Sequence, residues 1–374
     1  YWYPTVRLDY HINDRITWHG TWNMRWSQWQ KNYVYPGAPF YSGRDWAQPY
    51  TLSNAVDWTI RPNLTNTATF GNQMNWETFD TDTSTRMWKS YGNRRIYPSW
   101  ISNPIPNATP WDRNNPVFQV SDNLNWIKGR HTMTLGGDMM HTYFWETSWG
   151  NAGVLNYNIG IATGDPITSV INNAALPFLR SGSAGTTDVS NAQSLYATLT
   201  GRISSVTGSR NVDEITHKYN DFASMTQRFA RTRYSFFAQD SFRVTPSLSI
   251  NYGMRWEVSF GLYNTNSIDT SIPYADLLAP SNRLFRPGEL PGNMNAQFTV
   301  SPHPFPGDKI NPSPNLGIAW SPRYSEGLLG KLFGGKTVIR TAFRLTTYDE
   351  GMNTVSNNMS GNPGTLQSIN LRPG

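Results

Sequence analysis

The chain has 374 residues, of which 14% are aromatic and only 15% are charged, with a formal net charge of +6 and no cysteine. This composition argues against a helical bundle and a charged disordered chain, and it excludes disulfides and thiolate metal sites. No run of about 18 apolar residues occurs, which excludes a bundle of transmembrane helices. The same observation does not exclude a membrane β-barrel, because the strands of a barrel alternate between apolar and polar residues.

The chain begins at Tyr1 without an initiator methionine or a signal peptide and stops at Gly374. We therefore expect it to be an internal piece of a longer protein. Its basic residues are spread along the chain, with no run beyond pairs such as Arg94 and Arg95. No nucleic-acid partner is expected, because binding to phosphate backbones needs a concentrated basic surface.

Three β-hairpins with tight turns are predicted from period-two alternation and turn residues. They cover residues 56–76 with a turn at 61–63, residues 118–145 with a turn at 128–130, and residues 234–258 with a turn at 245–247. Each return strand carries an apolar-polar-apolar-Gly pattern, ending at Gly71, Gly136 and Gly253. The sequence therefore predicts a repeated hairpin.

The strand from Leu248 to Val258 alternates most clearly, and its length of about 11 residues matches a tilted strand that crosses a bilayer. We expect its apolar face and the matching face of the second hairpin to contact lipid. The residues predicted to face lipid are Leu248, Ile250, Tyr252, Met254, Trp256, Met133, Leu135 and Tyr143. The residues predicted to face a wet lumen are Asn251, Arg255 and Glu257.

Two long connections interrupt the hairpins, at residues 148–233 and 261–314, with a helical patch predicted at residues 191–199. Short turns at one end of the strands and long loops at the other are typical of bacterial outer-membrane barrels. Loops beyond about 15 residues are uncommon in compact soluble domains. The asymmetry therefore favours an antiparallel transmembrane β-barrel, with the two long connections as extracellular loops.

Tryptophans such as Trp126, Trp145 and Trp256 lie in or near the strand-like segments, several of them at their ends. This placement favours an aromatic girdle at the membrane border, where an indole ring meets hydrocarbon and its N–H meets water. Core packing or stacking on sugars in a soluble β protein is the alternative. Both interpretations stay open at this stage.

No catalytic or metal-binding arrangement emerges, so neither an enzyme nor a cofactor is expected. Residues 330–337 fit a phosphate-loop pattern, but the following segment at 338–345 is predicted to be a strand, whereas a phosphate loop must open a helix. His131 and His141 share a face but lie about 33 Å apart along a strand, too far to hold one ion. The carboxylate pairs Asp80/Asp82 and Asp213/Glu214 lie in loop-like segments.

Asp122 and Asp240 fall in phase with the apolar residues of their strands. A carboxylate facing lipid is costly away from the interface. We expect either a bulge that turns them away or a position near the turn end with a partner on a neighbouring strand.

Four segments together resemble Oar-like TonB-dependent outer-membrane receptors, which are abundant in Acidobacteria. They are, in the order of that family, residues 118–138, 195–214, 234–257 and 335–340. The resemblance implies a carboxypeptidase-regulatory-like domain, a plug and a barrel of about 22 strands. Residues 1–374 would form about half of such a barrel, and neither the plug nor that N-terminal domain is visible in the chain.

The resemblance implies a receptor in the bacterial outer membrane that binds its ligand at extracellular loops and passes it through a plugged barrel. Its expected partners are outer-membrane lipid and lipopolysaccharide, the TonB complex through the plug, and an extracellular ligand such as a glycan, siderophore or peptide. One alternative is a structural or adhesive outer-membrane surface protein. Another is a secreted soluble β protein that binds carbohydrate.

Overall fold

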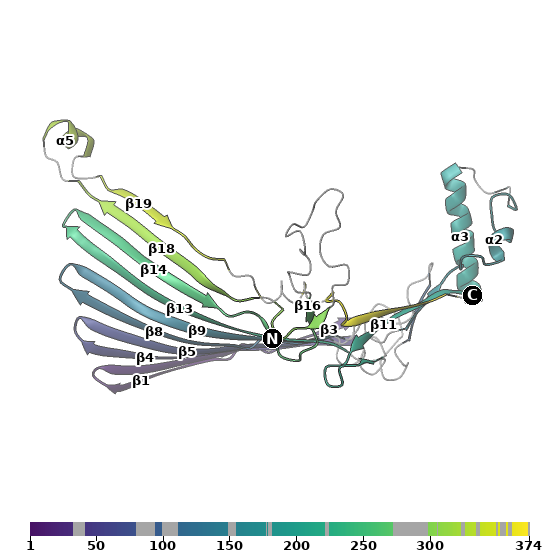
Figure 1. Ribbon diagram of the computed structural model, residues 1–374, viewed down its shortest axis with the longest axis horizontal. Helices are drawn as coiled ribbons and strands as arrows, with labels where there is room; N and C mark the ends of the chain where they lie inside the picture. The colour runs from purple at the N-terminus through teal and green to yellow at the C-terminus, as the bar shows by residue number, and fades with distance from the viewer. Residues whose placement is uncertain are drawn as a thin grey trace.

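The computed structural model is dominated by one large antiparallel sheet whose strands fan out on the left of Figure 1. The residues it describes are 1–32, 42–79, 94–98, 111–148, 155–176, 178, 182–220, 224–271, 298–304, 306–322, 326–333, 337–348, 351, 357 and 361–372. Its main strands are β1 (Thr5–Asn13), β2 (Ile16–Met24), β4 (Ser42–Arg61), β5 (Leu64–Phe79), β8 (Val117–Lys128), β9 (His131–Ser148), β13 (Met225–Thr245), β14 (Leu248–Ser259), β18 (Asp308–Trp320) and β19 (Ile339–Arg344). Each strand pairs with its neighbour in the chain order, so the connectivity is up and down throughout.

Tight turns join four of the strand pairs at one end of the sheet (Figure 1). The turns at 62–63, 129–130 and 246–247 are those predicted from the sequence, and a fourth lies at 14–15. Gly129 has φ +61°, as the first central position of a type II′ hairpin turn requires. The other three hairpins each skip one residue just before the turn, so a bulge adapts the ladder to the turn.

The register places alternate residues on two chemically different faces across the whole sheet. One row across six strands holds Trp58, Asn66, Leu124, Leu135, Ala238 and Met254. The adjacent row on the opposite face holds Asp57, Thr67, Asn123, Gly136, Phe237 and Arg255. We name these the apolar face and the polar face.

The apolar face is not covered by protein in the part of the chain that is described. Tyr252, Met254 and Trp256 keep 45%, 48% and 37% of their surface exposed. The same face exposes Phe70, Val120, Leu135, Tyr143, Phe236, Leu316 and Phe343. An uninterrupted exposed apolar surface of this extent calls for a partner that is itself apolar.

Prolines lie where the ladder of the large sheet is interrupted or where a strand is paired on one side. β7 (Trp111–Asn114) and β8 both lie between β5 and β9, and Asn115-Pro116 separates them. Pro312 and Pro314 lie in β18, where β14 pairs on one side and the β19 ladder begins only at Asn315. The sequence analysis placed both prolines in a long connection, because proline is unfavourable inside a fully paired strand.

The connection between β9 and β13 carries helices and strands of its own. It contains β10 (Leu155–Ile159), α2 (Ile167–Val170), α3 (Gly182–Thr200), β11 (Ile203–Val212) and β12 (Tyr219–Asn220). Helix α3 contains and extends the helix predicted at residues 191–199. Residues 225–233 were predicted to lie in the connection, because they show no alternation of apolar and polar residues. They belong to β13, where they pair with β9.

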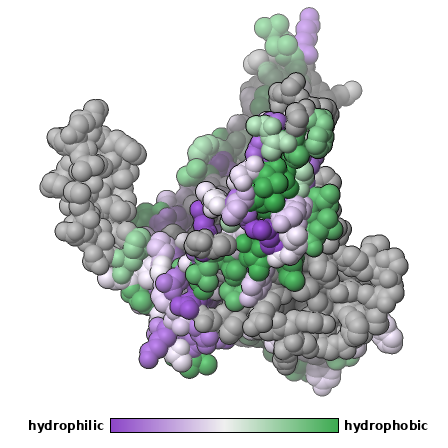
Figure 2. All heavy atoms as spheres, turned by 90° about the vertical axis from the view of Figure 1, so that its right-hand side faces the viewer, coloured by the Kyte–Doolittle hydropathy of each residue, from purple (hydrophilic) through white to green (hydrophobic). Residues whose placement is uncertain are grey.

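A second sheet lies beyond the end of the large sheet that carries the long connections (Figure 1). Its order is β12, β11, β10 and β6 (Arg94–Tyr97), with β20 (Leu366–Leu371) paired to β11. Seen from this end, hydrophobic and hydrophilic side chains are interspersed on the surface (Figure 2). Smaller elements are β3 (Ser27–Asn32), β15 (Tyr263–Asn264), β16 (Thr270–Ser271), β17 (Thr299–Val300) and α5 (Gly327–Phe333).

Among the described residues, no helix combines the length and the apolar character that a membrane crossing needs. The fold is an antiparallel β structure of the barrel type, as the sequence predicts. The strand predicted after the phosphate-loop-like segment is confirmed as β19, although residues 334–336 of that segment lie outside the described part.

The glycines of the hairpin repeat differ in the space around them, which gives a test of the register. A Cβ atom on Gly253 would lie 2.7 Å from Gln239 Cβ and 2.8 Å from the Ala238 carbonyl oxygen, whereas one on Gly71 would meet nothing closer than 4.0 Å. We expect Gly253→Ala to lower the free energy of unfolding by about 1 to 3 kcal/mol, and Gly71→Ala to change it by less than about 0.5 kcal/mol. Urea unfolding of the full-length protein in lipid vesicles measures both, and equal effects would contradict the register.

Candidate functional site

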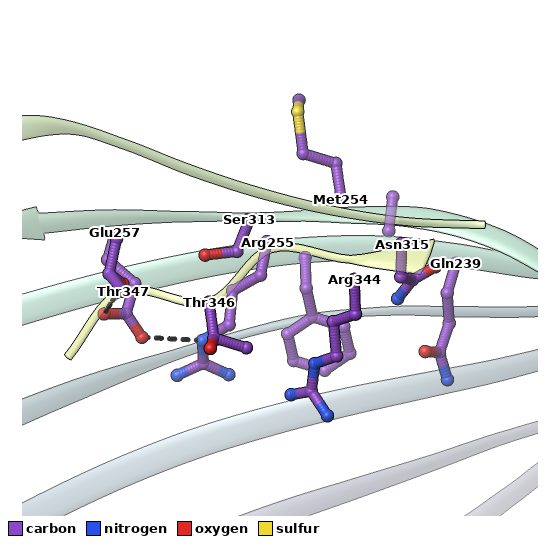
Figure 3. Close-up of a pocket in the computed structure, with 11 residues that line it drawn as sticks. Gln239, Met254, Arg255, Glu257, Ser313, Asn315, Arg344, Thr346 and Thr347 are labelled. Atoms are coloured by element: carbon purple, nitrogen blue, oxygen red, sulfur yellow. Dashed lines mark hydrogen bonds and ion pairs between the residues drawn. The ribbon is translucent and has the colours of Figure 1, made fainter. Parts of the chain in front are cut away.

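The polar face of β13, β14, β18 and β19 lines a solvent-open cavity of about 380 Å³. Its lining includes Phe237, Gln239, Arg255, Glu257, Ser313, Asn315, Arg344 and Thr347. In Figure 3, Arg255, Arg344 and Gln239 extend to one side of the sheet and Met254 to the other. The alternation seen in the sequence therefore separates a polar cavity from an apolar surface within a single strand.

Arg255 is the centre of a charged network on this face. Its guanidinium donates from Nη2 to Asp138 Oδ1 at 2.7 Å and from Nε to Glu257 Oε1 at 2.9 Å. The register explains the cluster, since Ser235 of β13 lies opposite both Asp138 of β9 and Glu257 of β14. Ser235 is fully buried and donates its hydroxyl to Asp138, whose side chain is only 9% exposed.

The aromatic ring of Phe237 supports the Arg255 guanidinium. Its ring lies against Gly136, where a Cβ atom would come within 2.7 Å of the ring edge, and the Arg255 guanidinium lies 6.0 Å from the ring centroid. A glycine opposite an aromatic residue on the neighbouring strand lets the ring lie over the backbone. The ring in turn supports the guanidinium by a cation–π contact.

The remaining charges leave the cavity able to bind polar ligands. Thr347 donates its hydroxyl to Glu257 Oε2 at 3.2 Å, so both oxygens of that carboxylate are engaged. Arg344 has no ion pair among the residues described. The cavity thus offers one guanidinium held by two carboxylates and a second guanidinium available for an anionic or carbonyl-bearing group.

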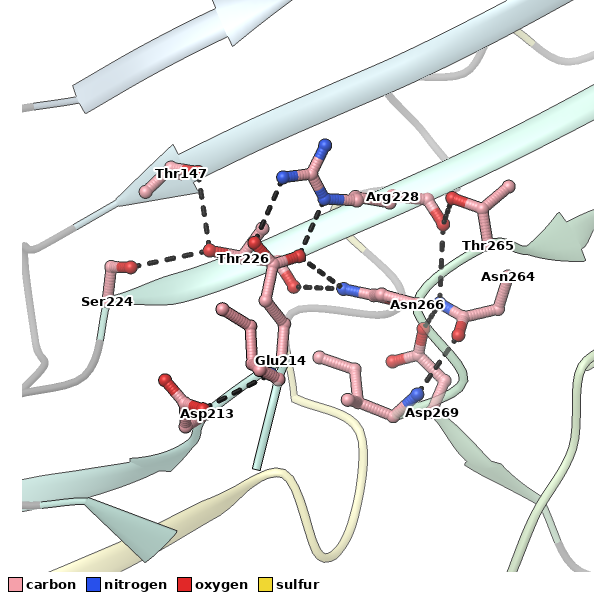
Figure 4. Close-up of polar contacts among 12 residues, drawn as sticks. Thr147, Asp213, Glu214, Ser224, Thr226, Arg228, Asn264, Thr265, Asn266 and Asp269 are labelled. Atoms are coloured by element: carbon pink, nitrogen blue, oxygen red, sulfur yellow. Dashed lines mark hydrogen bonds and ion pairs between the residues drawn. The ribbon is translucent and has the colours of Figure 1, made fainter. Parts of the chain in front are cut away.

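A second polar network joins the long connections to β13 (Figure 4). Glu214 accepts from Arg228 Nε at 2.6 Å and from Arg228 Nη2 at 2.9 Å, a two-pronged ion pair. The amide of Asn266 donates to the Thr226 carbonyl at 3.1 Å. The Arg228 guanidinium holds the pKa of Glu214 below its usual range, and hydrogen bonds from Thr216 lower the pKa of Asp213.

Asp269 lies in the same network but is almost completely buried. Its carboxylate accepts a hydrogen bond from the Asn264 amide, and the Asn264 side-chain oxygen accepts from the Ile268 N–H at 3.1 Å. Burial raises the pKa of Asp269 to about 6, since desolvation outweighs the hydrogen bond from Asn264.

The register assigns each residue that the sequence singled out to a face. The eight residues predicted to face lipid, Leu248, Ile250, Tyr252, Met254, Trp256, Met133, Leu135 and Tyr143, all lie on the apolar face. Asn251, Arg255 and Glu257, predicted to face a lumen, lie on the polar face. Arg255 and Glu257 belong to the charged network, whereas Asn251 lies nearer the turn end.

Asp122 and Asp240 lie on the apolar face with no bulge to turn them away. Asp240 Oδ2 contacts His131 Nδ1 at 2.6 Å and accepts from the Tyr252 hydroxyl at 2.9 Å, while Asp122 accepts from the Asn66 amide at 2.9 Å. Each carboxylate is therefore partnered by neighbouring strands near the turns, the second of the two alternatives that the sequence left open.

His131 and His141 make separate hydrogen bonds, His141 to the Thr232 hydroxyl at 2.7 Å. Within the described ranges, no group of three His, Cys, Asp or Glu side chains converges as a metal site would require. Asp80 and Asp82 lie outside the described residues.

Three residues of this site were not predicted from the sequence: Asp138 and Ser235 of the charged network, and Arg344 of the cavity lining. Asp138 stands in the polar phase of the strand that carries Met133 and Leu135, so alternation alone could have assigned its face. Asp138 lies on β9 and Arg255 on β14, with β13 between them, so no local pattern in the sequence indicates that they pair. The pairing of Glu214 with Arg228 likewise depends on how the connection folds back.

Comparisons with known proteins agree with the strand architecture. A family model described as an outer membrane beta barrel domain matches residues 2–373. The chain is similar to the copper transporter OprC, with 8% identity, a TM-score of 0.42, and coverage of 85% of this chain and 34% of that one. It is also similar to the outer membrane transporter YddB from Escherichia coli, with 9% identity, a TM-score of 0.43, and coverage of 87% and 38%. The chain spans 34% to 38% of the length of these solved structures, and no curated protein matches it.

Removal of the central guanidinium tests the charged network. We expect Arg255→Met to lower the free energy of unfolding by about 1 to 2 kcal/mol, because Asp138 would stay buried without its ionic partner. Asp138→Asn in the same chain should recover part of the loss. Arg344→Met is the matched control and should change stability by less than about 0.5 kcal/mol. Urea unfolding in vesicles measures all three, and an equal loss in the control would refute the network.

The raised pKa of Asp269 predicts a pH dependence of the loop around it. The fold favours the protonated carboxyl, so its stabilising contribution is complete below about pH 4 and is lost as pH rises through about 6, by up to about 3 kcal/mol. Hydrogen exchange of the Ile268 amide, corrected for its intrinsic rate, should therefore show more protection at pH 5 than at pH 7.5. Asp269→Asn should remove the dependence, and a variant that retains it would contradict the assignment.

Proposed function

Since the chain belongs to the outer membrane β-barrel domain family and is a bacterial outer-membrane protein, we propose that it forms part of the wall of an Oar-like, TonB-dependent receptor. In this proposal the receptor binds its ligand at extracellular loops and passes it through a plugged barrel. Transport consists of binding and plug movement, and the barrel itself makes and breaks no covalent bonds.

The observation that carries the proposal is the separation of two faces over the whole sheet. The apolar face carries large exposed side chains on strand after strand, while Ser, Thr, Asn, Asp and Arg line the opposite rows. This is the pattern of a membrane barrel whose interior is wet. We propose that Leu248, Ile250, Tyr252, Met254, Trp256, Met133, Leu135 and Tyr143 contact lipid.

The charged cavity supports a lumen that handles polar ligands. Asn251, Arg255 and Glu257 would face water in the lumen, with Arg255 and Glu257 held rigid by Asp138 and Thr347. Side chains that are already held in place lose little entropy when a ligand binds. The Arg344 side of the cavity would meet a passing ligand or the plug.

The two ends of the strands support an orientation. Tight two-residue turns lie at one end, and the long connections between β9 and β13, residues 149–224, and between β14 and β18, residues 260–307, emerge at the other. In bacterial barrels the short turns are periplasmic and the long loops extracellular. The long connections would therefore hold the ligand site, with the ligand class a glycan, siderophore or peptide.

The dependence on TonB and the Oar-like type rest on the resemblance of the segments at residues 118–138, 195–214, 234–257 and 335–340. Energy coupling would reach the barrel through a plug outside this sequence. Lipopolysaccharide and outer-membrane lipid would surround the apolar face.

A structural or adhesive role is the second candidate, and the second sheet favours it. β11 pairs with β20 over residues 206–211, and the neighbouring surface exposes Leu199 at 77% and Ile215 at 86%. An ordered outer module with exposed apolar residues is suited to contact with another surface.

Whole-cell uptake separates the two functions. The probes are a fluorescent maltooligosaccharide, a ferric siderophore and a labelled oligopeptide, offered to cells that carry the full gene, lack it, or carry it without its TonB-coupling segment. We expect at least one probe to accumulate only with the intact gene. Accumulation that is unchanged by loss of the coupling segment, or absent for every probe, would contradict the transporter. Loss of cell attachment in the gene deletion would then favour the adhesive role.

A further inference from the structure

Three tryptophans form a row across adjacent strands at the end of the sheet that carries the long connections. Trp46 of β4 stacks on Trp76 of β5, with ring centroids 6.3 Å apart and planes 8° from parallel. The ring of Trp76 lies 5.4 Å from that of Trp145 of β9. β7 connects the last two, since Asn114 is the register partner of both Trp76 and Trp145.

The row lies on the apolar face, near the end of the strands from which the long connections emerge. Trp145 has the same parity as Leu135 and Tyr143 on an unbroken ladder, so all three share a face. Trp76 and Trp145 stand about 12 and 14 residues from their turns, whereas a tilted strand crosses the hydrocarbon in about 9 to 11. The indoles therefore lie near the border of the hydrocarbon on the side of the long connections, on the face opposite the Arg255 cavity.

A cavity of about 330 Å³ opens beside the last two indoles. Its lining combines Trp76, Tyr143 and Trp145 with the polar side chains of Asn114 and Arg228. Trp76 keeps 37% and Tyr143 keeps 40% of its surface exposed. Flat aromatic rings beside an amide, a phenol and a guanidinium suit a ligand with an apolar ring face and hydroxyl groups at its edge.

The charge at the cavity points to a neutral ligand. Arg228 is the cation of the site. Its Nε and Nη2 atoms both donate hydrogen bonds to the carboxylate of Glu214. The Arg228 guanidinium also lies 5.6 Å from the centroid of the Trp145 ring, so it is fixed over the indole. A phosphate would have to compete with Glu214, whereas a hydroxyl group needs only a donor or an acceptor.

We propose that Trp76, Trp145, Asn114 and Arg228 form a binding site for a neutral sugar ring, with Trp46 stacked on the Trp76 indole and holding it in place. The site goes beyond transport, because it lies on the outer side of the barrel wall. The sugar comes either from the glycan of an outer-leaflet glycolipid beside the barrel or from a free oligosaccharide.

Binding measurements on the full-length protein in phosphatidylcholine nanodiscs test the site. The probes are free maltohexaose, and lipopolysaccharide that carries its polysaccharide incorporated into the nanodisc. We expect a sugar-dependent change in tryptophan fluorescence, an affinity about tenfold weaker in Trp76→Ala and Trp145→Ala, and recovery of most of the affinity in Trp76→Phe. Trp256→Ala is the matched control, since Trp256 is also 37% exposed on the same face and also hydrogen-bonded through Nε1.

The two probes distinguish the source of the sugar. If maltohexaose binds and lipopolysaccharide in the nanodisc does not displace it, the site takes free saccharide. If only lipopolysaccharide binds, the site takes the glycolipid. Thermal unfolding confirms that each variant is folded. The proposal is overturned if neither probe binds, if the Trp76 and Trp145 variants bind as well as the control, or if inorganic phosphate displaces the bound probe.

Discussion

A protein backbone that lies in hydrocarbon finds no water with which its polar groups could form hydrogen bonds. Every N–H and C=O must then pair within the protein, which for strands means a continuous ladder with neighbours on both sides. The unbroken registers of β8 with β9, β9 with β13 and β13 with β14 meet this requirement over the length of a bilayer. The bulges stand next to the turns, and the prolines of β18 stand where one side has no partner strand.

The same ladder creates the chemistry of the two faces. Because partners in register point the same way, an alternating strand extends its pattern to its neighbours, and a polar position on one strand meets polar positions on the next. Asp138, Ser235 and Glu257 form such a row, and Arg255 reaches across it. On the other face, Asp240 is tolerated because His131 and Tyr252, its neighbours in the ladder, hold its carboxylate.

Local sequence signals were sufficient to predict the hairpins. Residues 248–258 alternate between apolar and polar side chains, and the turn at 245–247 contains a proline that reverses the chain. Local signals were sufficient for the C-terminal half of α3, at residues 191–199, and for the strand at 339–344 as well. They were insufficient for residues 225–233, whose mixture of Thr, Arg and Ala has no apolar period, and whose strand structure comes from pairing with β9. The Arg255–Asp138 and Arg228–Glu214 pairs needed the order and register of strands far apart in the chain.

We expect the apolar face of β14 to meet lipid and its polar face to meet water. Spin labels placed singly from Ser249 to Glu257 in the full-length protein, reconstituted into lipid vesicles, measure this through collision with oxygen and with a water-soluble nickel chelate. Accessibility should alternate with a period of two, with labels at 250, 252, 254 and 256 accessible to oxygen and labels at 251, 253, 255 and 257 accessible to the chelate. Oxygen accessibility without alternation, or apolar positions shielded from both reagents as in a protein core, would contradict it.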